Sequence, residues 1–109
     1  MTYLYCMESE ILRALADPTR RAVFERLAAG ELCVGALKKG FDVSQPAISQ
    51  HLGQLRKAGL VTERREGRNT FYAANPAGLD PLLGWLERYR DFWPDRIERL
   101  KTVLKGMNQ

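Results

Sequence analysis

The stretch from residue 42 to residue 60 constrains the fold most, because its residues predict both ends of one helix. Ser44 can act as the N-cap by accepting a hydrogen bond from an otherwise unpaired amide, and Pro46 is tolerated within the first turn. Gly59 suits the left-handed position that follows many helices. The sequence therefore predicts a helix over about residues 45–58.

The two faces of this helix differ in chemistry. Ile48, Leu52 and Leu55 recur at helical spacing and predict a stripe that packs on a core. The opposite face is rich in small amides and hydroxyls instead of Glu and Lys. It comprises Gln45, Pro46, Ala47, Ser49, Gln50, Gly53, Gln54 and Lys57. Since Gln can pair with adenine and Ala or Pro can touch a thymine methyl group, this face favours the major groove of DNA; the alternative is a plain polar surface helix.

The positive charge of the chain is concentrated around this helix. The 109 residues carry a formal net charge of +4, and the pI is near 9.3. Such a charge suits acidic partners such as nucleic acid or anionic lipid. Residues 38–68 contain seven basic and three acidic side chains, an excess of four that equals the net charge of the whole chain.

The composition predicts one globular domain over residues 1–109. Hydrophobic residues make up 45% of the chain and charged residues 28%, which excludes a disordered chain. No apolar run approaches the roughly 20 residues that a bilayer requires, and no signal-peptide pattern is present. We therefore expect a cytoplasmic protein. Cys6 and Cys33 are too few for a disulfide scaffold and fit a reducing compartment.

The residues ahead of the capped helix predict three further helices. Apolar residues near helical spacing predict the first over about residues 4–16. Asp17 followed by Pro18 starts a second, over about residues 18–29. Cys33 occupies the N-cap of a short third helix. A brief turn joins this helix to the capped helix, and the two form a helix-turn-helix pair.

A basic β-hairpin is predicted after the capped helix. Residues 60–75 contain two runs that suit strands, separated by turn residues at 67–69. Two strands alone are marginal in water, so the hairpin must lean on the helices. With Arg68 near its tip, the hairpin is positioned to touch the phosphate backbone or the minor groove.

A long final helical segment is predicted over about residues 79–107. Its apolar residues are spaced alternately by three and four for most of its length, as in a coiled coil. They are Leu79, Leu82, Leu86, Tyr89, Trp93, Ile97, Leu100, Leu104 and Met107. Pro94 should kink or interrupt the segment, because its ring clashes with the preceding turn. A small domain cannot easily cover this stripe, so we expect a second copy of the chain to do so.

Four strings in register sharpen this layout. They are ALADPTRR at 14–21, ELCVGAL at 31–37, SQPAISQHL at 44–52 and LRKAGLV at 55–61. Over roughly residues 10–75 the chain resembles the ArsR (arsenic-repressor) family of bacterial transcriptional repressors. The resemblance implies a winged helix-turn-helix fold, mainly α with a small β-hairpin wing.

The resemblance also implies partners and sites. It implies a homodimer with an interface from the first and last helices, and two recognition helices in successive major grooves of an imperfect palindrome. The expected partner is double-stranded operator DNA, which the protein occupies to repress transcription. By position in the family's motif, the resemblance implies DNA contacts by Gln45, Pro46, Ser49 and Gln50 and phosphate contacts by Arg64, Arg65 and Arg68. Together with the face of the capped helix, the expected DNA-binding residues are Ser44, Gln45, Pro46, Ala47, Ser49, Gln50, His51, Gln54, Lys57, Arg64, Arg65 and Arg68. The implied interface residues are Leu4, Met7, Ile11, Leu82, Leu86, Tyr89, Trp93, Ile97 and Leu100.

The third helix departs from the metal-sensing members of the family. Those members resemble Glu-Leu-Cys-Val-Cys-Asp-Leu there, and two thiolates one residue apart can hold a thiophilic ion. This chain has Cys33 but Gly35 at the second position, and the last helix has no His. We therefore expect no metal and no cofactor, as in the SdpR-like branch. The alternatives are a redox or metal-responsive repressor that uses Cys33 with Cys6, or a winged helix that binds a protein partner.

An enzyme is not predicted. The sequence offers no paired carboxylates, no Ser/His/Asp set and no phosphate-binding loop placed for chemistry. Its single His, His51, lies in the capped helix, where contact with DNA or helix packing suffices. Cys33 is interpreted as a structural N-cap, and no small-molecule inducer can be named.

Overall fold

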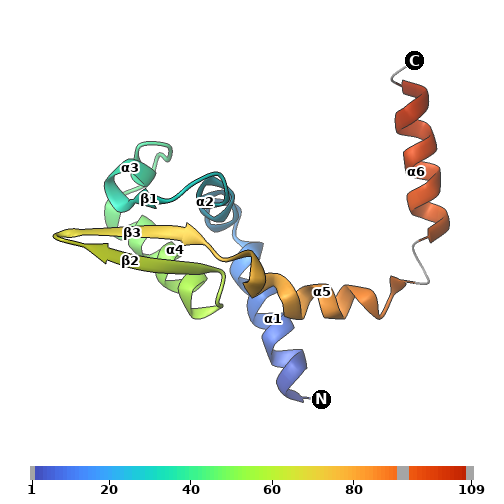
Figure 1. The fold of residues 1–109 in the computed structure, drawn as a ribbon, viewed down its shortest axis with the longest axis horizontal. Helices are drawn as coiled ribbons and strands as arrows, with labels where there is room; N and C mark the ends of the chain where they lie inside the picture. Colours follow the sequence, from blue (N-terminus) through green and yellow to red (C-terminus); the bar gives the residue numbers. More distant parts are fainter. Residues whose placement is uncertain (1, 91–93, 108–109) are drawn as a thin grey trace.

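Helices pack beside a small sheet in the winged helix-turn-helix order that the sequence predicts (Figure 1). The structure is a computed structural model that describes residues 2–90 and 94–107. The elements are α1 (Thr2–Ala16), α2 (Pro18–Ala28), β1 (Leu32–Cys33), α3 (Val34–Lys38), α4 (Gln45–Lys57), β2 (Val61–Glu66), β3 (Asn69–Ala74), the 3-10 helix η1 (Pro76–Leu79), α5 (Asp80–Glu87) and α6 (Pro94–Met107). The predicted fold class, mainly α with a β wing, is confirmed.

Local chemistry sets the ends of the helices. The side chain of Asp17 accepts a hydrogen bond of 2.9 Å from the amide of Arg20 at the start of α2. The hydroxyl of Ser44 accepts one of 3.2 Å from the amide of Ala47 at the start of α4. Gly59 follows α4 with φ of 80°, a conformation that side-chain-bearing residues rarely adopt. These caps match the prediction.

The sheet contains one strand that the sequence did not predict. The predicted hairpin of β2 and β3 is present, and Gly67 turns it with φ of 63°. The short strand β1 adds to β3, with Cys33 opposite Phe71, so the sheet order is β1-β3-β2. Cys33 does precede α3 as its N-cap residue, but its thiol makes no capping hydrogen bond. A strand of two residues has no periodicity, which explains why no pattern indicated it.

The core lies between α1, α2, α3, α4 and the root of the wing. The predicted stripe of Ile48, Leu52 and Leu55 is at most 1% exposed. Leu37 and Leu60, both 0% exposed, pack in the same cluster. The apolar face of α4 is thereby fixed, and its polar face is turned outward.

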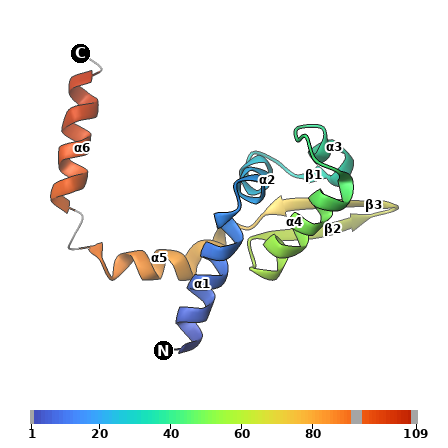
Figure 2. The same cartoon turned by 180° about the vertical axis from the view of Figure 1, so that it is seen from behind.

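The final segment is two helices instead of one. α5 ends at Glu87 and α6 begins at Pro94, so the predicted interruption is present while a continuous helix over 79–107 is not. Figures 1 and 2 show α6 set apart from the other helices. Proline suits the first turn of a helix, where its missing amide hydrogen costs no hydrogen bond. None of the described helices combines the length and apolar character needed to span a membrane.

A tight turn joins the wing to α5 and holds it against the end of α4. The amide nitrogen Nδ2 of Asn75 donates to the carbonyl of Gly59 at 3.0 Å, and the backbone amide of Asn75 donates to Leu60 at 2.7 Å. Gly78 lies against the backbone of Gly59, and a Cβ added to Gly78 would stand 2.0 Å from the carbonyl oxygen of Gly59. Only glycine fits there, so the start of α5 has a fixed position relative to α4.

Candidate nucleic-acid interface

The outward face of α4 presents the polar residues that the sequence singled out. Ser44 caps the helix at one end, and the face continues along its length. Its exposed members are Ser44, Gln45, Pro46, Ser49, Gln50, Gly53, Gln54 and Lys57, whereas Ala47 and His51 are half-buried. We call this set the recognition face. This face offers amide and hydroxyl groups to a partner, and its only charged side chain is Lys57, near the end of α4. Such groups suit hydrogen bonding to base edges.

His51 is turned toward α2. Its Nδ1 accepts a hydrogen bond of 3.3 Å from Nε of Arg20. The amide of Arg20, together with the charges of His51 and Arg20, holds the pKa of Asp17 below its ordinary value. The implied DNA contact of His51 is thus combined with a packing role. The sequence did not indicate Arg20, because no local pattern places a residue of α2 beside α4.

Arg64, implied as a phosphate contact, is already paired within the chain. Its Nη2 donates to Glu31 at 2.7 Å and its Nη1 donates to Glu66 at 2.6 Å. Its guanidinium also lies 4.9 Å from the centre of the Phe71 ring. These carboxylates raise the pKa of Arg64, and the hydrogen bond from Arg64 lowers the pKa of Glu31. Arg64 thus has two carboxylate partners within its own chain, and its implied phosphate contact stays a prediction. Glu31 is 33 residues away, so no local pattern indicated the pair.

The other two wing arginines differ from Arg64 in their contacts. Arg65 and Arg68 are exposed, and neither forms an ion pair with a residue in the described part of the chain. Arg56 of α4 pairs with Glu63 of β2 and so ties the recognition helix to the wing. Figures 1 and 2 show α4 on one face of the hairpin, whose tip extends beyond the helices. Unpaired cations near this tip are available to an anionic partner.

The implied interface residues fall into four groups. Ile11 is 2% exposed in the core of its own chain, so it has almost no surface left for a partner, and its implied contact is corrected. Met7 and Leu82 are half-buried, and Leu82 packs on the core. Leu86 and Tyr89 are each 40% exposed, and Leu100 is 58% exposed.

Trp93 lies outside the described residues, as do the side chains of Leu4 and Ile97. Further exposed apolar residues, absent from the prediction, are Leu12, Leu83 and Val103.

An ion pair and a ring contact lie beneath the exposed apolar residues of α5. Glu8 is 5% exposed, and its carboxylate lies 3.7 Å from the NH2 nitrogen of Arg88. Trp85 meets Tyr89 edge to face, with ring centroids 5.3 Å apart. Burying a carboxylate is costly unless it is paired, so this ion pair restricts how α5 can lie on α1.

The described side chains offer little to a metal ion. Within that part of the chain no three His, Cys, Asp or Glu residues come together, and Cys33 is a half-buried free thiol. The side chain of Cys6 lies outside the description. A repressor without a metal inducer and a repressor that responds through Cys33 and Cys6 therefore both stay predictions.

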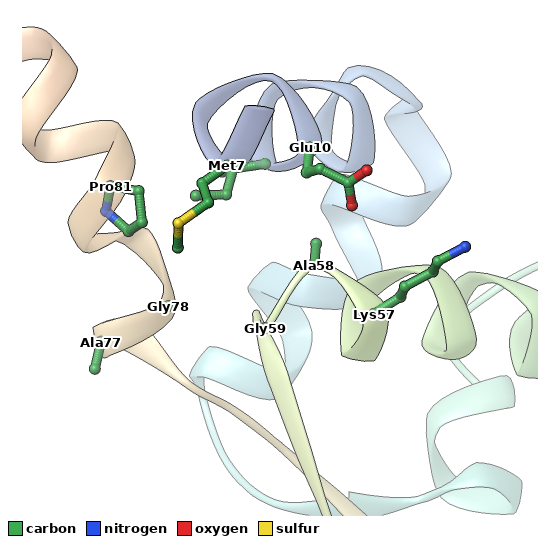
Figure 3. Close-up of a pocket in the computed structure, with 9 residues that line it drawn as sticks. Met7, Glu10, Lys57, Ala58, Gly59, Ala77, Gly78 and Pro81 are labelled. Carbon is green, nitrogen blue, oxygen red and sulfur yellow. The ribbon is translucent and has the colours of Figure 1, made fainter. Parts of the chain in front are cut away.

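A cavity of about 400 Å³ lies between α1, the end of α4 and the start of α5. Met7, Gly78 and Pro81 form its apolar walls (Figure 3). The charged ends of Glu10 and Lys57 are turned away from Met7 in this view. The cavity adjoins the pinned turn described above, so a molecule seated there would contact both α4 and α5.

Comparisons with known proteins identify similar regulators. The family model described as "Helix-turn-helix domain" matches residues 15–64. The HTH-type transcriptional regulator Rv2034 of Mycobacterium tuberculosis is 49% identical over 77 residues, which span 71% of this chain and 72% of the relative. The transcriptional repressor SdpR of Bacillus subtilis is 31% identical over 78 residues, which span 72% of this chain and 87% of the relative.

Solved structures give the same picture. An ArsR-like transcriptional regulator from Rhodococcus sp. RHA1 has a TM-score of 0.73 and 30% identity, and the match covers 91% of this chain and 93% of that one. A crystal structure of an ArsR family transcriptional regulator has a TM-score of 0.71 and 33% identity, with 80% of this chain and 90% of that one covered. These similar proteins are transcriptional regulators, which are not enzymes, as the sequence predicts for this chain.

Proposed function

Because the chain belongs to the ArsR family of helix-turn-helix transcriptional regulators, we propose that it represses transcription as a homodimer on a palindromic operator, without a metal inducer. The observation that carries the proposal is the recognition face, a row of amides and hydroxyls whose only charged member is Lys57, with unpaired cations on the neighbouring wing. Phosphate contacts position a protein on DNA, whereas contacts to base edges specify the sequence. The two kinds of side chain are arranged here for these two tasks.

In this proposal the recognition face reads bases and the wing holds the backbone. Gln50 lies in the middle of the recognition face, and its exposed amide suits a bidentate contact with adenine. Arg65 and Arg68 bind phosphates, because they are the wing arginines without a carboxylate partner among the described residues. Arg64 instead stabilises the wing through Glu31.

The homodimer follows from the apolar side chains that one chain leaves exposed. Leu86 of α5 and Leu100 of α6 retain much of their surface in water, as do the residues around them. A palindromic site needs two correctly spaced readers, so the same surface that covers these leucines would set the distance between two α4 helices. An inducer is not assigned, and the metal-free mode is supported by Gly35, which stands where the metal-sensing members carry a second Cys.

DNA binding is tested by fluorescence anisotropy with the duplex immediately upstream of the coding sequence and with a mixed-sequence duplex. Gln50→Ala should cost about 1–3 kcal/mol on the operator and little on the mixed sequence. Arg68→Ala should weaken binding to both duplexes. It should also lower the slope of log affinity against log salt by about one unit for each phosphate that the variant no longer binds.

Arg64→Ala is the matched control within the wing, since it removes the same charge from a paired arginine. Its salt slope should change less than that of Arg68→Ala. A Gln50→Ala variant with wild-type affinity for a mapped operator would remove Gln50 from base reading. If the wild type binds neither duplex at low or moderate salt, the alternative of a protein-binding winged helix replaces the proposal.

A further inference from the structure

A second hollow lies beside the cavity of Figure 3, where α1, α2 and α4 meet. It has a volume of about 230 Å³. Arg13, Arg20 and Lys57 line it, together with Gln54 and Glu10. We call it the cation pocket, because three cationic side chains outnumber the single carboxylate. Glu10 and Lys57 border both hollows, and Figure 3 shows their charged ends turned the same way.

The cations of this pocket form no ion pair with a described residue, although the charge of Arg20 acts on Asp17 and lowers the pKa of its carboxyl. Arg13 and Lys57 are exposed and form no ion pair or hydrogen bond with the residues that the structure describes. The Nε of Arg20 donates a hydrogen bond to His51, and the terminal nitrogens of Arg20 make no hydrogen bond with the described residues. Three donors of this kind around one hollow would attract an oxyanion, since charge-assisted hydrogen bonds from arginine to phosphate are strong.

We propose that the cation pocket binds a phosphate group of the operator backbone. This inference rests on the proposed function. It is favoured because the pocket continues the recognition face: Gln54 and Lys57 follow Gln50 by four and seven residues and share its side of α4. When α4 enters a major groove, a phosphate at the edge of that groove comes to the side of the helix where Arg13 and Arg20 stand.

The pocket would add a positioning contact from outside the helix-turn-helix pair. Arg13 belongs to α1, which the ion pair of Glu8 with Arg88 ties to α5. A phosphate held by Arg13 therefore links the DNA backbone to the helices expected at the dimer interface. The spacing of the two recognition helices would then be held by two sets of DNA contacts, those of α4 and those of Arg13.

The experiment measures affinity for the mapped operator and for a mixed-sequence duplex over a series of salt concentrations, with the full chain. Arg13→Gln removes the charge from an exposed helical position and keeps a good helix former. Its slope of log affinity against log salt should fall by roughly 0.9 for each phosphate that is no longer bound, that is by roughly 1.8 for the two pockets of a dimer. Both duplexes should show the change, because a phosphate carries no sequence information.

Two variants control this result. Arg26→Gln removes an exposed cation from the far end of α2 and should leave the slope at the wild-type value. Arg13→Lys retains the charge and should largely retain the slope. Circular dichroism and thermal unfolding confirm that each variant is folded. An Arg13→Gln slope equal to that of Arg26→Gln overturns the inference, while a wild type without salt-dependent DNA binding overturns the proposed function itself.

A free phosphate compound offers the same chemistry as the DNA backbone, so a second arm separates the two sources. Calorimetry with inorganic phosphate, at an ionic strength matched with chloride, measures binding to the wild type and to Arg13→Gln. Phosphate binding that disappears in Arg13→Gln, together with an unchanged salt slope on DNA, would assign the pocket to a free anion and overturn the inference. A neutral methylphosphonate at the contacted position should weaken the wild type and leave Arg13→Gln unaffected.

Discussion

The body of the molecule, from α1 to α5, and its last helix, α6, bury their apolar side chains to different extents. In the body, Leu37 and Leu55 are 0% exposed. In α6, Leu100 and Val103 are each 58% exposed and Leu104 is 50% exposed. The body completes a core within one chain, although Leu12 of α1 and Leu83 of α5 stay exposed on its surface, whereas α6 carries an apolar stripe that one chain leaves in water.

This difference shows what apolar spacing can and cannot tell. Leu82 and Leu100 belong to one predicted seam with one periodicity, yet Leu82 packs on the core of its own chain and Leu100 does not. Periodicity identifies the face of a helix that avoids water. It does not identify whether the same chain or a second copy covers that face.

The largest effect is expected in the body. Leu55→Ala should lower the free energy of unfolding by about 2–5 kcal/mol, because it leaves a cavity in a closed core. Denaturant titration at one fixed protein concentration measures this change. Lys38→Ala, at an exposed position of α3, is the control and should cost much less. Equal effects for the two variants would contradict the closed core.

The next effect concerns α6. Leu100→Ala should weaken self-association by about 1–2 kcal/mol per chain if a partner covers the exposed part of this side chain. Sedimentation equilibrium over a range of concentrations measures the dissociation constant, with Lys105→Ala on the same helix as the control. A wild type that sediments as a single chain at micromolar concentration, with operator binding intact, would refute the dimer and leave α6 without the role proposed here.

A smaller effect, confined to the body, is expected at the cap of α2. Asp17→Ala should lower the Tm at pH 7, and Asp17→Asn, which keeps an acceptor for the amide of Arg20, should lower it less. The folded pKa of Asp17 lies below its unfolded value, so its contribution is present above the unfolded pKa and is lost as pH falls through the folded pKa. Thermal scans from neutral to acidic pH should show the gap between wild type and Asp17→Ala closing in that window.

The smallest effect is expected from metals, for which neither region assembles ligands among its described residues. Zinc, cadmium or arsenite should change operator affinity by less than about threefold, which is under roughly 0.7 kcal/mol. The comparison is wild type against a Cys6→Ser, Cys33→Ser double variant, each with chelator, metal or mild oxidant. A metal effect abolished in the double variant would contradict this prediction, and an oxidant effect abolished in the same way would favour the redox alternative.

Features that depend on neighbouring residues could be predicted from the sequence. Asp17 and Ser44 cap their helices, and Gly59 ends α4, because each acts on amides or backbone angles only a few residues away. The buried stripe and the polar face of α4 follow from helical spacing alone. Most of the recognition face could therefore be predicted before the fold was known.

Features that join distant residues were decided only by the tertiary structure. Pairing with β3 makes a strand of two residues that have no pattern of their own, and the fold brings Glu31 to Arg64 and Arg20 to His51. The physical reason is that a hydrogen bond or ion pair between distant residues depends on where the whole chain places them. Local spacing predicts which face of a helix is apolar or polar, and packing then determines which arginines remain free for DNA.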